Sequence, residues 1–100
     1  MIRRKKTIIV YTGKKSQLKD FGFNFIESNN EYERKANSWS DGYQTFYESI
    51  YINSANIVKS RLYNDLSNFE WTGYIERTDH YIKDLDNAGL LKIKEIEDWI

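Results

Sequence analysis

The only histidine of the chain, His80, lies among carboxylates that could assist proton transfer. Glu76, Asp79 and Asp84 are all within four residues of it. General acid–base catalysis needs such a group to be placed against a substrate and its pKa to be tuned. The chain has no second histidine for the commonest metal pairs, no cysteine, and no serine or threonine in a nucleophile elbow. We therefore expect no catalytic residues, no cofactor, and a protein that is not an enzyme.

Oxygen-bearing side chains between Asp84 and Glu95 have the spacing of a calcium-binding loop. With Asp84 as position one, Asp86 is position three, Gly89 position six and Glu95 position twelve, which resembles an EF-hand loop. Position five is alanine and position nine is lysine, so one ligand is missing and one positive charge is added. A helix that ends at Gly89 explains the same glycine without an ion. We expect no metal site, and the calcium candidates are Asp84, Asp86 and Glu95.

The segment Asp79–Glu95 is similar to the recognition helix and first wing strand of winged-helix DNA-binding domains. Its helix is followed by Gly89 and Leu90 and then by an expected strand. The resemblance implies that this helix would present side chains to base edges in a DNA groove. The helix instead carries three aspartates against one lysine, and residues 7–52 are expected to be mostly strands and not a trihelical core. A winged-helix-like DNA binder is therefore a less favoured alternative.

The charge of the chain is zero overall but unevenly distributed. Residues 16–100 carry nine basic and fifteen acidic side chains, whereas the first fifteen residues carry only basic ones: Arg3, Arg4, Lys5, Lys6, Lys14 and Lys15. We expect residues 1–6 to form a flexible basic arm. Such an arm could bind phosphates, because each neutralised phosphate releases counterions; it could equally be a solvated terminus beside an edge strand. A nucleic-acid-binding accessory protein is the alternative function.

Aromatic residues are the most abundant candidate binding residues, and they number sixteen. A domain of about 100 residues buries only roughly two-thirds of its unfolded surface, so some rings are expected to be exposed. Tyrosine and tryptophan are enriched at protein interfaces. We expect a non-catalytic binding or regulatory protein, of the inhibitor or adaptor type, that docks an aromatic-rich surface on a protein partner or self-associates. The predicted contact residues are Tyr43, Tyr47, Tyr51, Trp39 and Trp99.

Length and composition predict one domain over residues 1–100. There is no stretch long enough to span a membrane, no signal peptide and no cysteine, so we expect a cytoplasmic protein without membrane contact. Only three alanines occur, while isoleucine, lysine, asparagine and tyrosine are abundant. Because the codons of these abundant residues are A/T-rich and those of alanine are G/C-rich, this composition indicates an AT-rich genome, as in many low-GC bacteria, phages and plasmids. With the small size, it favours an accessory protein of a phage or another mobile element.

The pattern of residues predicts an α+β fold, with an antiparallel sheet of about four to six strands packed against two helices. A short helical turn is expected from Ser16 to Phe21, ended by Gly22. Residues 37–42 are expected to form a loop by composition. The expected strands are Thr7–Thr12, Phe23–Ser28, Glu31–Ala36, Tyr43–Ile52 and Trp71–Arg77.

Residues 43–52 fit two structures, since their apolar residues match a helical stripe as well as strand alternation. Their tyrosine, threonine and isoleucine content favours the strand. A helix is expected from Asn53 or Ser54 to about Leu66, because its apolar residues have helical spacing. A second helix begins at Asp79 and ends at Gly89, with Leu85 and Leu90 forming the contact of a Schellman motif. The last ten residues are compatible with either a strand or a helix.

Overall fold

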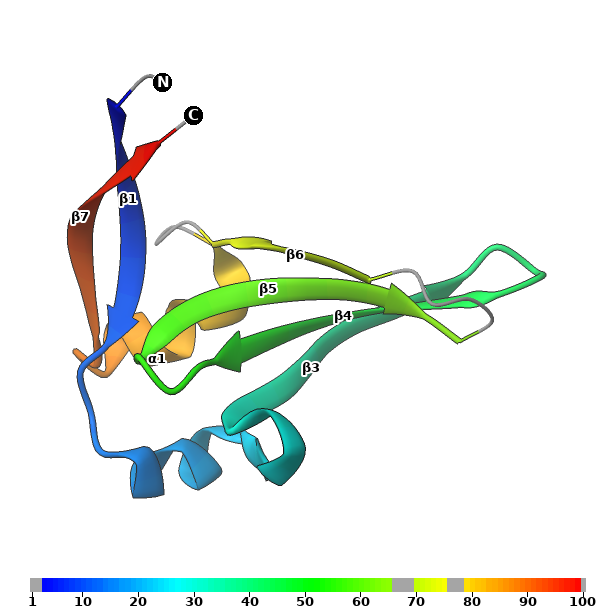
Figure 1. The fold of residues 1–100 in the computed structure, drawn as a ribbon. Helices are drawn as coiled ribbons and strands as arrows, with labels where there is room; N and C mark the ends of the chain where they lie inside the picture. Colours follow the sequence, from blue (N-terminus) through cyan, green and yellow to red (C-terminus); the bar gives the residue numbers. More distant parts are fainter. Residues whose placement is uncertain (1–2, 66–69, 76–78, 100) are drawn as a thin grey trace.

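An antiparallel sheet of seven strands makes up most of the computed structural model, which describes residues 3–65, 70–75 and 79–99 (Figure 1). The strands are β1 (Arg3–Tyr11), β2 (Asn24–Ile26), β3 (Glu31–Ser40), β4 (Thr45–Ile52), β5 (Ile57–Asn64), β6 (Glu70–Tyr74) and β7 (Leu91–Trp99). The helical segments are short: the 3₁₀ turns η1 (Lys15–Phe21), η2 (Glu27–Asn29) and η3 (His80–Ile82), and the helix α1 (Lys83–Asn87). The expected antiparallel sheet is present, but it has seven strands in place of four to six, and short helical segments take the place of the two expected helices.

The sheet divides at β5 into two arms. The strand order is β2-β3-β4-β5-β1-β7, and β6 also pairs with β5. On the side away from β4, Ile57 and Val58 pair with β1, and residues 59–63 pair with β6. One arm is therefore the two-stranded β1–β7 ribbon and the other consists of β3 to β6, and the two point in different directions in Figure 1.

The hydrophobic core lies where the two arms meet. Leu18 and Phe23 from the η1 region and Ile82 and Leu85 from the η3–α1 region cover one face of the sheet. The remaining core residues are Ile9, Tyr11, Ile50, Ile52, Val58 and Ile75. Because side chains alternate along a strand, Ile50 and Ile52 lie on the core face of β4, and Tyr47 and Tyr51 lie on the other.

The helix expected from Asn53 or Ser54 to Leu66 is wrong. Residues 57–64 form β5, and residues 53–56 form the turn that leads into it. The Asn53 side chain closes this turn, since its Oδ1 accepts hydrogen bonds of 3.0 Å from the amides of both Ala55 and Ile57. Asn56 adopts a left-handed conformation at φ 65°, which asparagine tolerates well. Asparagine turn chemistry therefore overrides the apolar spacing; Leu66 lies outside the described residues.

Other expectations are confirmed or corrected strand by strand. The strand choice for residues 43–52 is confirmed by β4, although Tyr43 lies in the turn before it, and residues 91–99 form a strand. The loop expected at residues 37–42 is wrong for residues 37–40, because β3 continues to Ser40 after a bulge between Lys35 and Asn37. Asp41 and Gly42 lie in the turn that follows. The strand expected at Trp71–Arg77 is shorter as β6, and Arg77 lies outside the described residues.

Both predicted ends of the second helix are confirmed, whereas the helical turn expected from Ser16 begins at Lys15 with Lys14 as its N-cap. Asp79 caps η3 by accepting a hydrogen bond of 2.8 Å from the Tyr81 amide. Gly89 has φ 72°, and the amide of Leu90 donates to the Leu85 carbonyl at 3.1 Å, as a Schellman motif requires. The helix itself has only five residues, and the described part of the chain contains no trihelical core of the winged-helix kind. No helix among the described residues is long and apolar enough to cross a membrane.

Candidate protein-interaction surface

The turn between β3 and β4 is held by a dense set of hydrogen bonds. Asp41 Oδ1 accepts from the amides of Tyr43 and Gln44, both at 2.9 Å. Ser40 Oγ accepts from the Gly42 amide at 3.1 Å and donates to the Gln44 carbonyl at 3.2 Å. The two amide hydrogen bonds lower the pKa of Asp41 below its ordinary value, with Gln44 contributing most. The charged form of the Asp41 carboxylate therefore holds the turn.

Aromatic rings gather on one face of the arm formed by β3 to β6, outside the core. Trp39 stacks on Phe46, with ring centres 5.6 Å apart. Trp71 on β6 projects to the same face. In the ladder it is opposite Leu62 of β5, and Leu62 is opposite Glu48 of β4, which lies on the same face as Phe46 two residues before it. Trp39 is 43% exposed and Trp71 is 54% exposed. We call Trp39, Phe46 and Trp71 the tryptophan face.

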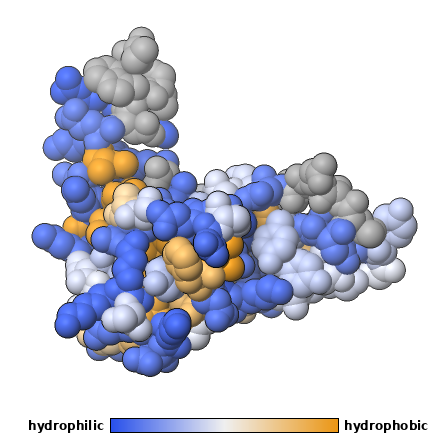
Figure 2. Space-filling view, turned by 60° about the horizontal axis from the view of Figure 1, so that its bottom comes forward, coloured by the Kyte–Doolittle hydropathy of each residue, from blue (hydrophilic) through white to orange (hydrophobic). Residues whose placement is uncertain are grey.

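The ring of Trp71 lies against the backbone of Gly73. A Cβ atom at Gly73 would overlap this ring, so any larger residue there would displace it. One side of the indole therefore packs on the strand, and more than half of the side chain stays exposed. In the space-filling view, this arm is mostly of intermediate hydropathy, where Trp, Tyr, Ser and Thr fall, while strongly hydrophobic surface lies near the junction (Figure 2).

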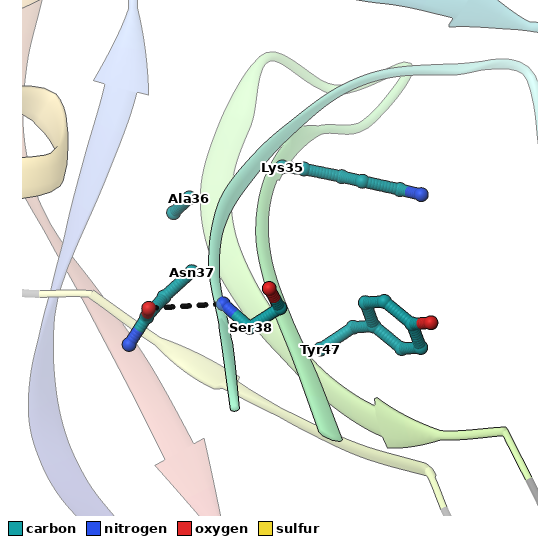
Figure 3. Close-up of a pocket in the computed structure, with 5 residues that line it drawn as sticks. All are labelled: Lys35, Ala36, Asn37, Ser38 and Tyr47. Atoms are coloured by element: carbon teal, nitrogen blue, oxygen red, sulfur yellow. Dashed lines mark hydrogen bonds between the residues drawn. The ribbon is translucent and has the colours of Figure 1, made fainter. Parts of the chain in front are cut away.

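The opposite face of the same arm carries a tyrosine pair. Tyr47 and Tyr63 are opposite each other in the ladder and stack with ring centres 5.3 Å apart. The Lys35 ammonium lies 5.2 Å from the centre of the Tyr47 ring. These two side chains border an open pocket of about 390 Å³ at the β3 bulge, together with residues 36–38 (Figure 3). Burial raises the pKa of Tyr63 above its ordinary value, and the electrostatic effects of Glu33 and Tyr47 raise it further.

A nearly buried charge cluster lies beside the tyrosine pair. The Arg61 guanidinium lies 2.7 Å from Glu31, 2.9 Å from Glu33 and 3.0 Å from Glu70, and its carbon is 4.2 Å from the centre of the Tyr51 ring. The contact with Glu70 is an ion pair without hydrogen-bond geometry. Burial lowers the pKa of Arg61, but the hydrogen bond and charge of Glu31 and the other two carboxylates raise it further, so the net shift is upward. This cluster joins β3, β5 and β6.

The five predicted contact residues do not form one surface. Tyr43 is 83% exposed in the turn, and Trp39 and Tyr47 lie on opposite faces. Tyr51 is buried under Arg61. The backbone of Trp99 is in β7, but its side chain lies outside what the structure describes. Phe46, Trp71 and Arg61 were missed; reading residues 57–64 as a strand would have placed Arg61 on the tyrosine side.

The six N-terminal bases are divided between two places. Arg3, Arg4, Lys5 and Lys6 belong to β1 where a flexible arm was expected, and they pair in register with residues 96–99 of β7. Arg3 Nη1 is 3.5 Å from Glu97 Oε1, so acids of β7 accompany this basic strand. Lys14 and Lys15 follow the other end of β1, roughly 25 Å away at 3.3 Å per residue. Lys15 Nζ donates to the Asn53 carbonyl at 3.4 Å.

The calcium candidates are divided between α1, which holds Asp84 and Asp86, and β7, which holds Glu95. Asp84 in α1 pairs with Arg34, at 2.7 Å between Oδ2 and Nη1, and Glu95 is opposite Thr7 in the β1–β7 ladder. Asp86 lies in α1, where its carbonyl accepts from the Gly89 amide. Within the described ranges, no group of three or more His, Cys, Asp or Glu side chains could hold a metal ion.

Comparison with models of protein families, with curated proteins and with solved structures gives no match for this chain.

Proposed function

We propose that this chain is a non-catalytic binding protein, of the inhibitor or adaptor type, that docks on a protein partner through the end of the β3–β6 arm. The observation that carries the proposal is the exposure of three large rings there: Trp39, Trp71 and Tyr43. Large rigid aromatic side chains dominate the binding energy of protein interfaces, and tryptophan and tyrosine are the commonest hot spots.

The chemistry of this end of the sheet also favours a protein partner. Between Ala36 and Tyr47 the only charged residue is Asp41, although charged residues are 30% of the chain. Depletion of charge with enrichment of aromatic residues is typical of the core of a protein interface. Nucleic-acid binding depends on basic groups placed along a phosphate backbone, and the six N-terminal bases lie at the two ends of β1.

The proposal is tested by affinity capture from cells that encode the chain, with each extract divided into nuclease-treated and untreated halves. We expect a protein partner that survives nuclease and is reduced at least tenfold by Trp39→Ala together with Trp71→Ala. The matched control replaces Arg3, Arg4, Lys5 and Lys6 by alanine, and it should retain the partner. Recovery that disappears with nuclease would replace this function with the nucleic-acid alternative. Light scattering on the pure protein shows whether it forms a homodimer, and the same measurement on the double variant shows whether this face is used for it.

A further inference from the structure

The exposed tyrosine in the β3–β4 turn has a more specific use. We infer that Tyr43 is the anchor of the interface, and that it enters an apolar concave pocket on the partner protein. This inference rests on the proposed function and names the part of the surface that penetrates the partner and the shape of the partner site.

The turn that carries Tyr43 is pre-organised. All five backbone amides from Asp41 to Thr45 donate to acceptors within the protein: the Gln44 carbonyl, Ser40 Oγ, Asp41 Oδ1 twice, and Asp65 Oδ1. Gly42 has φ 90°, a conformation in which glycine has no Cβ to strain. An interface residue held in this way loses little conformational freedom on binding, which is the main benefit of pre-organisation.

The end of β5 supports the turn from the side. The Asp65 amide donates to the Thr45 carbonyl at 3.1 Å, and the Thr45 amide returns a hydrogen bond of 2.9 Å to Asp65 Oδ1. The Asn64 side chain donates to Gln44 Oε1 at 3.0 Å. The turn therefore projects past the end of β5 and is held from the side by Asn64 and Asp65, as the right-hand end of Figure 1 shows. A rigid turn that projects from the protein fits a concave partner site better than a flat partner site.

The same hydrogen bonds exclude an anionic ligand at the turn. An anion-binding turn needs free backbone amides or a cation, and here five consecutive amides are already bonded. No lysine or arginine occurs from Ala36 to Tyr47, and the one charge, on Asp41, is negative. What the turn offers outward is the ring of Tyr43, 83% exposed. A ring with a hydroxyl at its end matches an apolar pocket with a polar group at its base.

The turn and the end of β3 that leads into it resemble an antibody binding loop in composition. Such loops are rich in Tyr, Ser, Gly, Asn and Trp, which give wide contact with few rotors to fix. Residues 37–43 read Asn-Ser-Trp-Ser-Asp-Gly-Tyr. The stacked Trp39–Phe46 pair lies next to the turn on the tryptophan face, where it would contact the rim of the partner pocket.

The test is site-specific photocrosslinking in nuclease-treated extract of cells that encode the chain. In one variant Tyr43, and in another His80, is replaced by the photoreactive p-benzoylphenylalanine. His80 is a matched control, since its side chain is 78% exposed on η3, away from the turn. We expect one protein adduct from position 43 and none from position 80, with the crosslink mapped by mass spectrometry to residues that line a pocket of the captured protein.

Binding measurements with four variants on the purified partner complete the test. We expect Tyr43→Ala to weaken binding at least tenfold and Tyr43→Phe to weaken it less. Asp41→Ala, which removes the acceptor of two amides, should weaken binding while Asp41→Asn, which keeps an oxygen there, should retain most of it. Circular dichroism on each variant confirms that the fold is kept.

The failures are distinguishable. If the partner is lost with the Trp39→Ala, Trp71→Ala double variant but binds Tyr43→Ala unchanged, or if the crosslink maps to a flat surface, the anchor is wrong and the proposed function stands. If no nuclease-resistant protein is bound by the wild-type chain, the proposed function is wrong and the inference with it.

Discussion

The Nη2 atom of Arg61 lies 2.7 Å from Oε1 of Glu31, and both side chains are almost buried within the sheet. Glu33 is bound by the same guanidinium, and the ring of Tyr51 stacks against it. Buried charges are tolerated only when they are paired, because desolvation of an unpaired charge costs several kcal/mol. Arg61 is therefore the counter-ion on which two carboxylates of β3 depend.

Removing Arg61 is expected to be strongly destabilising. Arg61→Ala leaves Glu31 and Glu33 without their counter-ion, and the free energy of unfolding should fall by about 3–5 kcal/mol. Urea denaturation followed by circular dichroism measures this. Glu70→Gln is the matched control, since that carboxylate is more than half exposed, and it should change stability by less than about 1 kcal/mol. An equal effect of the two substitutions would show that the cluster does not hold the sheet together.

Arg34 holds both helical regions to β3. Its Nη1 donates to the Phe21 carbonyl at 2.8 Å and to Asp84 at 2.7 Å, and its Nη2 donates to the Tyr81 carbonyl. Arg34→Ala leaves two partly buried carbonyls without a donor, so we expect a loss of about 2–4 kcal/mol in urea denaturation. Arg3→Ala, in the exposed pair with Glu97, should change stability by less than about 1 kcal/mol. A similarly small effect of Arg34→Ala would contradict this role.

The Arg34–Asp84 pair predicts an acid dependence of stability. Burial raises the pKa of Asp84, but the hydrogen bond and charge of Arg34 and the Leu85 amide lower it further, so its net pKa is below the ordinary value. A carboxyl whose pKa is lowered by folding contributes stability that is complete above its unfolded pKa of about 3.9 and is lost as the pH falls through its folded pKa.

Asp84→Asn tests this dependence because it removes the titration and keeps an oxygen for Arg34. Stability should fall at neutral pH, and the loss of stability between about pH 5 and pH 2 should be shallower than in the wild type. Urea denaturation over this range measures both. Parallel acid limbs for the two proteins would show that Asp84 is not coupled to folding.

Local chemistry explains which parts of the fold could be predicted from the sequence. The cap at Asp79 and the left-handed glycine at Gly89 depend on residues within a few positions of each other, and both are confirmed. The strand character of residues 45–52 follows from β-branched and aromatic side chains. The turn at Asn53 is equally local, but the apolar spacing of the residues after it fits a helix as well, and those residues form β5.

The charge cluster and the tryptophan face could not be predicted, because both depend on strand register. Arg61 meets Glu31 and Glu70 only once β3, β4, β5 and β6 are aligned. Likewise, Trp39 and Trp71 share a face through two intervening strands, and a one-residue slip would move either to the other side. The sequence predicts an aromatic interface, and the register decides which rings share a face.

Gly13 and Tyr11 provide a last prediction, on the packing at the end of β1. The Tyr11 hydroxyl donates to the Lys14 carbonyl at 2.6 Å, so the ring folds back over Gly13. A Cβ atom at Gly13 would lie 2.5 Å from this hydroxyl and 2.9 Å from Gln17 Oε1. We expect Gly13→Ala to lower the free energy of unfolding by about 1–3 kcal/mol through overpacking, and Tyr11→Phe to lower it by about 1 kcal/mol through the lost hydrogen bond.

The two substitutions should not add, since Tyr11→Phe removes the atom that the new methyl group meets most closely. We expect the double variant to be more stable than the sum of the single effects predicts by about 1 kcal/mol, as measured in a double-mutant cycle by urea denaturation. Gly89→Ala is the control: nothing lies within 4 Å of its Cβ, and its effect arises from the positive φ alone. It should therefore add to Tyr11→Phe within about 0.5 kcal/mol. Additivity at Gly13 as well would mean that the ring of Tyr11 does not lie over that glycine.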